Sequence, residues 1–241
     1  MNNAAMLEKC RRFADQVIPE LQGTTYYILD SDALNNESAY THDELVGWAA
    51  QAANVSELLP RYLGADWRGP GPAIFLNLTW LRRHAYPGQF ERAVLGVEVH
   101  ELGHLAFPLR MPGERTPRVA SAIAELQDAV VRYSLNPVNL AKPANDEGHD
   151  WKWIRRTCHL YVRAAFRGYS LPHLRLLHSG YCDFASQDYL PQLLEEALRM
   201  REEPMEAIDA LPPLQWLVEQ YEADVERLMA EIDDEHPCGV V

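Results

Sequence analysis

Residues 99–106 read VHELGHLA, which places His100 and His104 four positions apart with Glu101 directly after the first histidine. On an α-helix, positions i and i+4 lie one turn apart on the same face, so both imidazoles can bind one zinc ion. Glu101 is rotated by about 100° from His100 on the same helix. Its carboxylate therefore lies beside the ion, where it can take a proton from a metal-bound water. The pattern predicts a zinc site with Glu101 as the catalytic acid–base group.

The helix that carries this motif is predicted over Gln89 to Phe107, because apolar residues recur with helical spacing and Pro108 follows. The apolar residues around the histidines predict that this helix is largely buried. Gly103 lies within it and costs about 1 kcal/mol of helix propensity relative to Ala. We expect the reason for this glycine to be the close approach of another chain segment or of a substrate strand.

Two histidines do not complete a catalytic zinc site, which needs a third protein ligand and one position open to water. One candidate is Glu125 in ASAIAELQDAV, residues 120–130. This segment resembles the glutamate helix of the gluzincins, the thermolysin-like zinc proteases, in which a glutamate after HExxH binds the metal. Asp128, one turn further on, resembles the acidic residue with which that family orients a ligand histidine.

The second candidate is His149 in EGHDWKW, residues 147–153. This segment resembles the third-ligand segment of the SprT-like and Spartan proteases, in which a His–Gly pair precedes Glu and then Trp or Phe at a helix start. An alignment without a gap on the Asp–Trp pair places the family's histidine at Glu147 instead. We favour His149 because neutral imidazole is the commonest metal ligand, and Glu125 is the alternative third ligand.

The resemblance to the SprT-like proteases extends from about Arg92 to Arg167, and its last part is the predicted helix HDWKWIRRTCHLYVRAAF. Trp151 and Trp153 are expected to anchor this helix. His159 is predicted to be a core or surface histidine rather than a ligand. The arginines of the helix are predicted to form a solvated face that pairs with the acidic C-terminal helices. They are Arg155, Arg156, Arg163 and Arg167.

Two early strands followed by a run of helices predict an α+β fold. The other predicted elements are helices over Leu7–Leu21, Thr41–Leu58, Arg118–Leu135 and Leu214–Ile232 and strands over Thr24–Asp30 and Ala73–Leu78. The second strand is expected at the sheet edge, where a substrate backbone can add as another strand. The resemblance implies a zincin-like metalloprotease domain with a small mixed sheet, an HExxH helix and a helical C-terminal extension. We predict the domain at residues 1–180 and the extension at residues 181–241, packed together as one structural unit.

The chain has 241 residues and a formal net charge of −13. Such an acidic balance argues against nucleic-acid binding, which depends on Lys and Arg contacts to phosphates. The four cysteines form no CxxC pair, which favours a reducing cytoplasm over a disulfide framework. No apolar stretch approaches 18 residues and the N-terminus lacks a signal-peptide pattern, so no membrane span is expected.

These observations predict a cytoplasmic zinc-dependent metallopeptidase that hydrolyses peptide bonds of a protein or peptide substrate. Zn²⁺ is its expected cofactor, bound by His100, His104 and His149, and Glu101 is its expected general base and acid. The alternative is a zincin-like metal-binding protein that acts through partner binding without turnover. Neither nucleic acid nor a membrane is an expected partner, and no oligomeric state is predicted.

Overall fold

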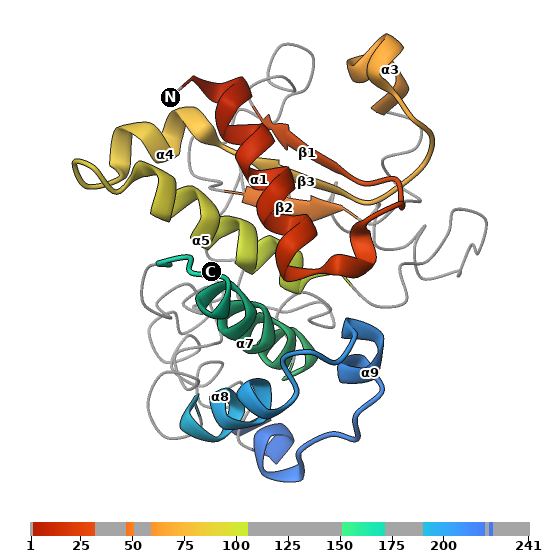
Figure 1. Ribbon diagram of the computed structural model, residues 1–241, viewed down its shortest axis with the longest axis vertical. Helices are drawn as coiled ribbons and strands as arrows, with labels where there is room; N and C mark the ends of the chain where they lie inside the picture. Colours follow the sequence, from red (N-terminus) through yellow and green to blue (C-terminus); the bar gives the residue numbers. More distant parts are fainter. Residues whose placement is uncertain are drawn as a thin grey trace, which may run out of the picture.

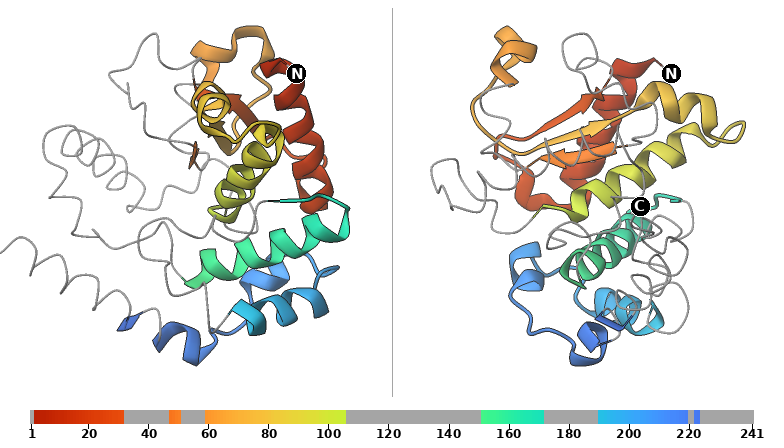
Figure 2. Two further views of the ribbon diagram at one scale, coloured as in Figure 1. Left: turned by 90° about the vertical axis from the view of Figure 1, so that its left-hand side faces the viewer. Right: turned by 180° about the vertical axis from the view of Figure 1, so that it is seen from behind.

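The computed structural model describes residues 2–31, 47–50, 59–105, 151–171, 190–219 and 222–223. Within these residues the fold is α+β, as the sequence predicts: a small mixed sheet, helices packed against it, and a helical part formed by the later residues (Figure 1). The sheet and the later helices remain separate regions when the molecule is viewed from the side and from behind (Figure 2). The candidate site lies where these two regions meet.

The sheet has three strands, β1 (Tyr27–Asp30), β2 (Gly47–Ala50) and β3 (Ala73–Leu76), in the spatial order β1-β3-β2. β1 runs parallel to β3, and β2 runs antiparallel to it. All four residues of β3 are buried, as expected for an apolar central strand with a neighbour on each side. A close approach before β3 requires Gly71, since a Cβ there would lie 2.0 Å from the backbone oxygen of Thr25.

Two predictions about these strands are wrong. The sequence predicts a helix over Thr41–Leu58, but Gly47–Ala50 form β2, because pairing with β3 outweighs the local helix preference of this alanine-rich segment. The sequence also predicts the strand over Ala73–Leu78 at the sheet edge, whereas β3 lies in the centre between β1 and β2. That strand ends at Leu76 because the side chain of Asn77 caps the next helix by accepting a hydrogen bond from the Trp80 N–H.

Helices α1 (Asn3–Val17) and α5 (Phe90–Gly103) pack on the same face of the sheet, where they share a core with Ile28 and Ile74. The buried residues of α1 recur with helical spacing and are Met6, Cys10, Phe13, Ala14 and Val17. The sequence places this helix at Leu7–Leu21, but Pro19 follows its last turn and holds Ile18 out of the helical region. Residues 19–21 therefore form a separate 3-10 turn.

The opposite face of the sheet packs against the short helix α3 (Leu59–Leu63), where Leu59 is buried with Tyr27 and Phe75. A 3-10 turn over Gly64–Asp66 follows α3. Helix α4 (Leu78–His84) leads from the end of β3 to the start of α5. The sheet therefore has helices on both faces, with the larger core on the side of α1 and α5.

The later helices are α7 (Trp151–Phe166), α8 (Leu190–Arg199) and α9 (Met205–Asp209). α7 contacts α1 and α5 on one side and α8 and α9 on the other (Figures 1 and 2). The helix predicted to begin at residue 149 is thus confirmed from residue 151 onward. Of the helix predicted over Leu214–Ile232, residues 215–219 and 222–223 are described and helical. The helix predicted over Arg118–Leu135 lies outside the described residues.

The arginine face of α7 pairs with the C-terminal helices, as predicted, but it is buried rather than solvated. Nε of Arg155 lies 3.0 Å from Oε1 of Glu196 on α8, and Nε of Arg156 lies 2.6 Å from Oδ1 of Asp209 on α9. Arg155, Arg156 and Arg163 are all at least nine-tenths buried. The prediction of a solvated face is wrong for these three arginines, because α8 and α9 cover their guanidinium groups and supply the carboxylates that neutralise two of them. Arg167 is exposed, as predicted.

No helix in the described part of the chain is long and apolar enough to cross a membrane. The division into residues 1–180 and 181–241 stays a prediction. α7 contacts elements on both sides of that boundary and is the helix through which the sheet region meets the C-terminal helices.

Candidate metal centre

The helix that carries the histidine pair is held in the core, as predicted. Eight residues of α5 are buried, and they are Val94, Leu95, Gly96, Glu98, Val99, Glu101, Leu102 and Gly103. α5 contacts β2, β3, α1, α4 and α7. Its neighbours restrain the motif from several sides, so the positions of the two histidines follow from the packing of the whole sheet region.

The helix ends earlier than the sequence predicts. α5 ends at Gly103, and His104 is its C-cap with a right-handed helical backbone, φ −75° and ψ −16°. The backbone N–H of His104 donates to the backbone oxygen of Glu101 at 3.1 Å, a 3-10 hydrogen bond that tightens the last turn. The Gly103 carbonyl accepts a 2.8 Å hydrogen bond from Nη1 of Arg156, so α7 satisfies a carbonyl that a longer helix would have used.

The two imidazoles lie close enough to share an ion. The ring centroids of His100 and His104 are 5.2 Å apart, and the ring planes make an angle of 62°. Two imidazoles on one tetrahedral zinc, with bonds of about 2.0–2.1 Å, have ring centres about 5 Å apart. Both side chains are half-buried, which leaves them reachable from solvent. The spacing and exposure of the pair therefore fit a divalent metal ion.

Glu101, the predicted general base, is 5% exposed. Burial raises the pKa of its carboxyl to about 8, because the low-dielectric surroundings disfavour the charged form. A carboxylate with a raised pKa is a stronger base than an exposed one, and a nearby cation would favour its ionised form. The environment of Glu101 thus suits a group that takes up and releases a proton.

A second carboxyl lies one turn earlier on α5 and was not singled out from the sequence. Glu98 is fully buried, and no nitrogen or oxygen donor among the described residues hydrogen-bonds to its carboxyl, which faces the Cys10 thiol. Burial raises the pKa of Glu98 well above its ordinary value, while the neighbouring Cys10 thiol acts weakly in the opposite direction. In the sequence, the buried position of Glu98 is indicated only by the apolar residues on either side of it. Glu98 faces the core with Cys10 and is not part of the histidine pair.

Helix α7 contributes Trp153 to the surroundings of the histidine pair, and this side chain is 1% exposed. Its ring centroid lies 4.7 Å from that of His100 and 5.6 Å from that of His104. Its indole N–H donates to the backbone oxygen of His100 at 3.1 Å. The expectation that this tryptophan anchors the helix is confirmed, but its contact with both imidazoles has no counterpart in the sequence pattern.

Gly103 has the structural role expected of it. A Cβ at this position would lie 2.3 Å from Oγ1 of Thr157 and 3.1 Å from Nε1 of Trp153. The close approach is therefore that of α7, because any larger residue would push this helix away from α5. Of the two reasons considered for Gly103, the structure shows the packing of another chain segment.

The candidate third ligands all lie outside the described residues. They are Glu125, Glu147 and His149, and the possible orienting residue Asp128 lies outside them as well. In the ranges that are described, no three His, Cys, Asp or Glu side chains gather closely enough to hold a metal ion. His149 precedes the first residue of α7 by two positions, a reach of at most about 7 Å. The assignment of the third ligand stays a prediction.

The predicted core histidine is confirmed as such. His159 is 0% exposed, and its Nε2 lies 3.4 Å from Oε1 of Glu196 at the contact of α7 with α8. Burial lowers the pKa of His159, more than the attraction of Glu196 raises it. The ring is therefore neutral at pH 7, with its proton on Nε2 facing the carboxylate. His159 belongs to the contact between α7 and α8 and not to the histidine pair.

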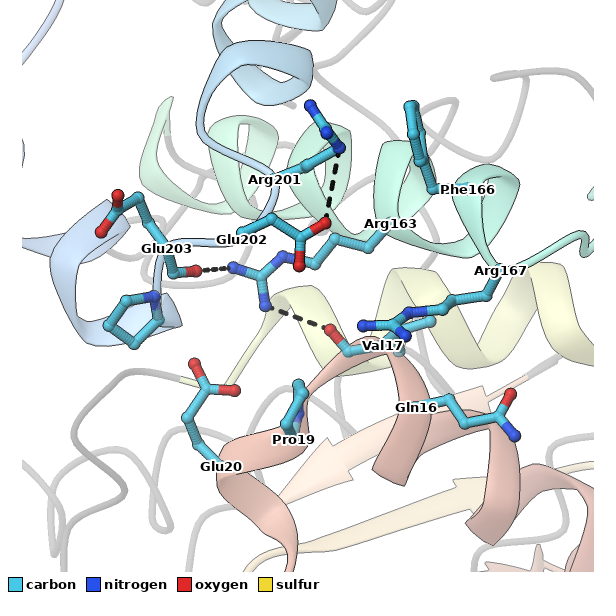
Figure 3. Close-up of a pocket in the computed structure, with 11 residues that line it drawn as sticks. Gln16, Val17, Pro19, Glu20, Arg163, Phe166, Arg167, Arg201, Glu202 and Glu203 are labelled. Atoms are coloured by element: carbon cyan, nitrogen blue, oxygen red, sulfur yellow. Dashed lines mark hydrogen bonds and ion pairs between the residues drawn. The ribbon is translucent and has the colours of Figure 1, made fainter.

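A cavity of about 370 Å³ lies elsewhere, between the end of α1, the second half of α7 and the link between α8 and α9 (Figure 3). Three arginines and three glutamates line it, and no residue of α5 does. Arg163 crosses its floor and donates to the backbone oxygens of Val17 and Glu203. This cavity is separate from the histidine pair, and its balanced charges favour neither anions nor cations.

The chain matches no protein-family model, and no curated protein or solved structure is significantly similar to it. The function therefore has to be argued from the chemistry and geometry of its own residues.

Proposed function

We propose that this chain is a zinc-dependent metallopeptidase of zincin type. The observation that carries the proposal is the pair of half-buried imidazoles 5.2 Å apart, with a buried carboxyl on the residue after the first. His100 and His104 would hold the ion with His149 as third ligand. Glu125 is the alternative. A zinc ion in this site would acidify its bound water and polarise the scissile carbonyl.

Glu101 supplies the proton chemistry. As a buried base with a raised pKa, its carboxylate takes a proton as the attacking water becomes a nucleophile. The protonated carboxyl then returns this proton to the leaving amine, so one residue serves as base and acid in turn. The surrounding core, which leaves Glu101 only 5% exposed, limits the access of bulk water to that proton.

The choice of His149 is supported by the position of α7. Trp153 touches both imidazoles and lies in the first turn of this helix, so the start of α7 is close to the pair. His149 is four residues before Trp153 along the chain. This short separation along the chain favours His149 as a ligand, whereas the described residues give no comparable support for Glu125.

Zinc content measured by mass spectrometry tests the ligand set. We expect about one zinc per wild-type chain and loss of zinc in His100→Ala, His104→Ala and His149→Ala. His84→Ala is the control, because His84 is an exposed histidine on α4 and should leave the zinc content unchanged. Zinc retained by His149→Ala and lost by Glu125→Ala would assign the third ligand to Glu125.

A Glu101→Gln variant tests the mechanism separately from metal binding. The amide keeps the shape of the side chain but cannot accept the proton, so we expect unchanged zinc content and peptide cleavage reduced by about 10²–10⁴-fold. Digestion of a broad peptide library would measure this cleavage. A zinc-loaded wild type that cleaves no member of the library would favour the alternative, a metal-binding protein that acts through a partner.

A further inference from the structure

We propose that Trp153 is a positioning residue that holds both imidazoles of the metal centre in place from the neighbouring helix. This role rests on the proposed zinc site and adds to it a contact from outside the HExxH motif. Two sets of contacts carry the inference, one to the imidazole rings and one to the backbone between them.

The first set consists of ring contacts. The indole of Trp153 lies 4.7 Å from the imidazole of His100 with planes at 67°, and 5.6 Å from that of His104 with planes at 33°. The two imidazoles are 5.2 Å apart, so the three rings form a compact triangle. Rotation about the last torsion of a histidine is broad and soft. A rigid, buried neighbour against both rings therefore restricts the directions in which their nitrogens point.

The second set concerns the backbone between the histidines. In a regular α-helix the His100 oxygen would accept the N–H of His104, but here that N–H donates to the Glu101 oxygen at 3.1 Å. The indole N–H of Trp153 donates to the His100 oxygen, also at 3.1 Å. Trp153 thus hydrogen-bonds to the backbone of the tightened turn between the two histidines. The tightened turn sets the position of the second ligand relative to the first.

The approach of α7 that makes these contacts possible depends on two further residues. Gly103 leaves space for Thr157, since a Cβ would lie 2.3 Å from its Oγ1. Arg156 donates to the Gly103 oxygen and pairs with Asp209 on α9. α7 is therefore held against the end of α5 by several contacts, and the ring of Trp153 lies against both imidazoles.

The test compares Trp153→Phe with a matched control. Phenylalanine keeps an aromatic ring but removes the N–H donor and part of the ring surface. Trp80→Phe is the control, because Trp80 stacks on a histidine that is not part of the site, with centroids 4.1 Å apart. Zinc affinity is measured by competition with a chelator, and the visible absorption of the Co²⁺-substituted protein reports ligand geometry without any need for turnover.

We expect Trp153→Phe to bind zinc about 10–100-fold more weakly than wild type, with a changed Co²⁺ spectrum. Trp80→Phe should match wild type in both measurements. If Trp153→Phe does not fold, benzothienylalanine at position 153 tests the hydrogen bond alone, because it keeps the ring shape and replaces the N–H with sulfur.

The outcomes separate this role from the proposed function. A wild type that binds no zinc would overturn the proposed function and the positioning role together. A wild type that binds zinc, with a folded Trp153→Phe variant of equal affinity and identical Co²⁺ spectrum, would overturn the positioning role alone. Equal values in the benzothienylalanine variant would overturn the part of that role that rests on the N–H donor.

Discussion

At the scale of single residues, Glu98 has a carboxyl in a buried environment that disfavours its charged form. Its carboxyl is fully buried on α5, and in the part of the chain that the structure describes no nitrogen or oxygen donor hydrogen-bonds to it. Burial favours the neutral form, so Glu98 holds its proton at pH values where an exposed glutamate has lost it. At pH values between the unfolded and the folded pKa of Glu98, the folded chain therefore binds more protons at this residue than the unfolded chain does.

This difference predicts a pH dependence of stability. The pKa of Glu98 is raised in the folded state, so its contribution is fully present below the unfolded value of 4.5 and is lost as pH rises through the folded value. In metal-free protein, Glu98→Gln should remove this decline, so wild type and variant should diverge with increasing pH. Urea unfolding at several pH values between 4 and 9 measures the divergence. A constant difference between the two proteins would contradict the assignment.

The residues of the site differ in how far the sequence could predict them. His100, Glu101 and His104 were predictable because their relation is local, one turn of one helix. Trp153 was predicted only to anchor its own helix, since its contact with His100 spans 53 residues and depends on how α7 crosses α5. For Gly103, the sequence predicts that some close approach must offset the cost of a glycine in a helix. It does not predict that the approaching segment is α7.

At the scale of elements, the contact of α7 with α9 depends on a buried ion pair. Nε of Arg156 lies 2.6 Å from Oδ1 of Asp209, and both side chains are about nine-tenths buried. The same guanidinium donates to the Gly103 oxygen, so it links α9 through α7 to the end of α5. A buried guanidinium without its carboxylate is costly, since the desolvation of the charge remains while the attraction is lost.

Asp209→Ala should therefore lower the free energy of unfolding by about 3–5 kcal/mol. Replacing both partners, with Arg156→Met and Asp209→Leu, should recover part of this loss because no charge is left unpaired. The control is Glu8→Ala, which removes an exposed pair with Arg11 at 3.8 Å and should change stability by less than about 1 kcal/mol. Denaturant titrations give all three values, and equal losses in Asp209→Ala and the control would contradict the argument.

The elements also show where local patterns fail. Amphipathic α1 and α7 were predictable to within a few residues, because their apolar spacing is a property of each helix alone. β2 was not predictable in this way, because the sequence of Gly47–Ala50 favours a helix. This segment forms a strand by pairing with β3. The early end of α5 at Gly103 likewise depends on a hydrogen bond from α7. The sequence-based predictions of these elements fail where the hydrogen-bond partner comes from another helix or strand.

At the scale of the whole molecule, α7 joins the sheet region to the C-terminal helices. Arg163 hydrogen-bonds to both of these regions, on the side of α7 away from the histidine pair. It is 5% exposed and donates to the Val17 oxygen at the end of α1 and to the Glu203 oxygen between α8 and α9 (Figure 3). One side chain of α7 thus binds the backbone of both regions at once. Burial lowers the pKa of its guanidinium, but such a group stays charged at neutral pH.

Arg163→Met should lower the free energy of unfolding by about 2–4 kcal/mol, because two carbonyls lose a charged donor. It should also speed amide hydrogen exchange in α8 and α9 more than in the sheet, since those helices lose a tie to α1. Arg167→Met is the matched control, an exposed arginine of the same cavity just after α7, and should change stability by less than about 0.5 kcal/mol. Zinc content should be unchanged in both variants, because the cavity is separate from the histidine pair. Uniform exchange across both regions in Arg163→Met would mean that they unfold as one unit, and that Arg163 does not join two parts of unequal stability.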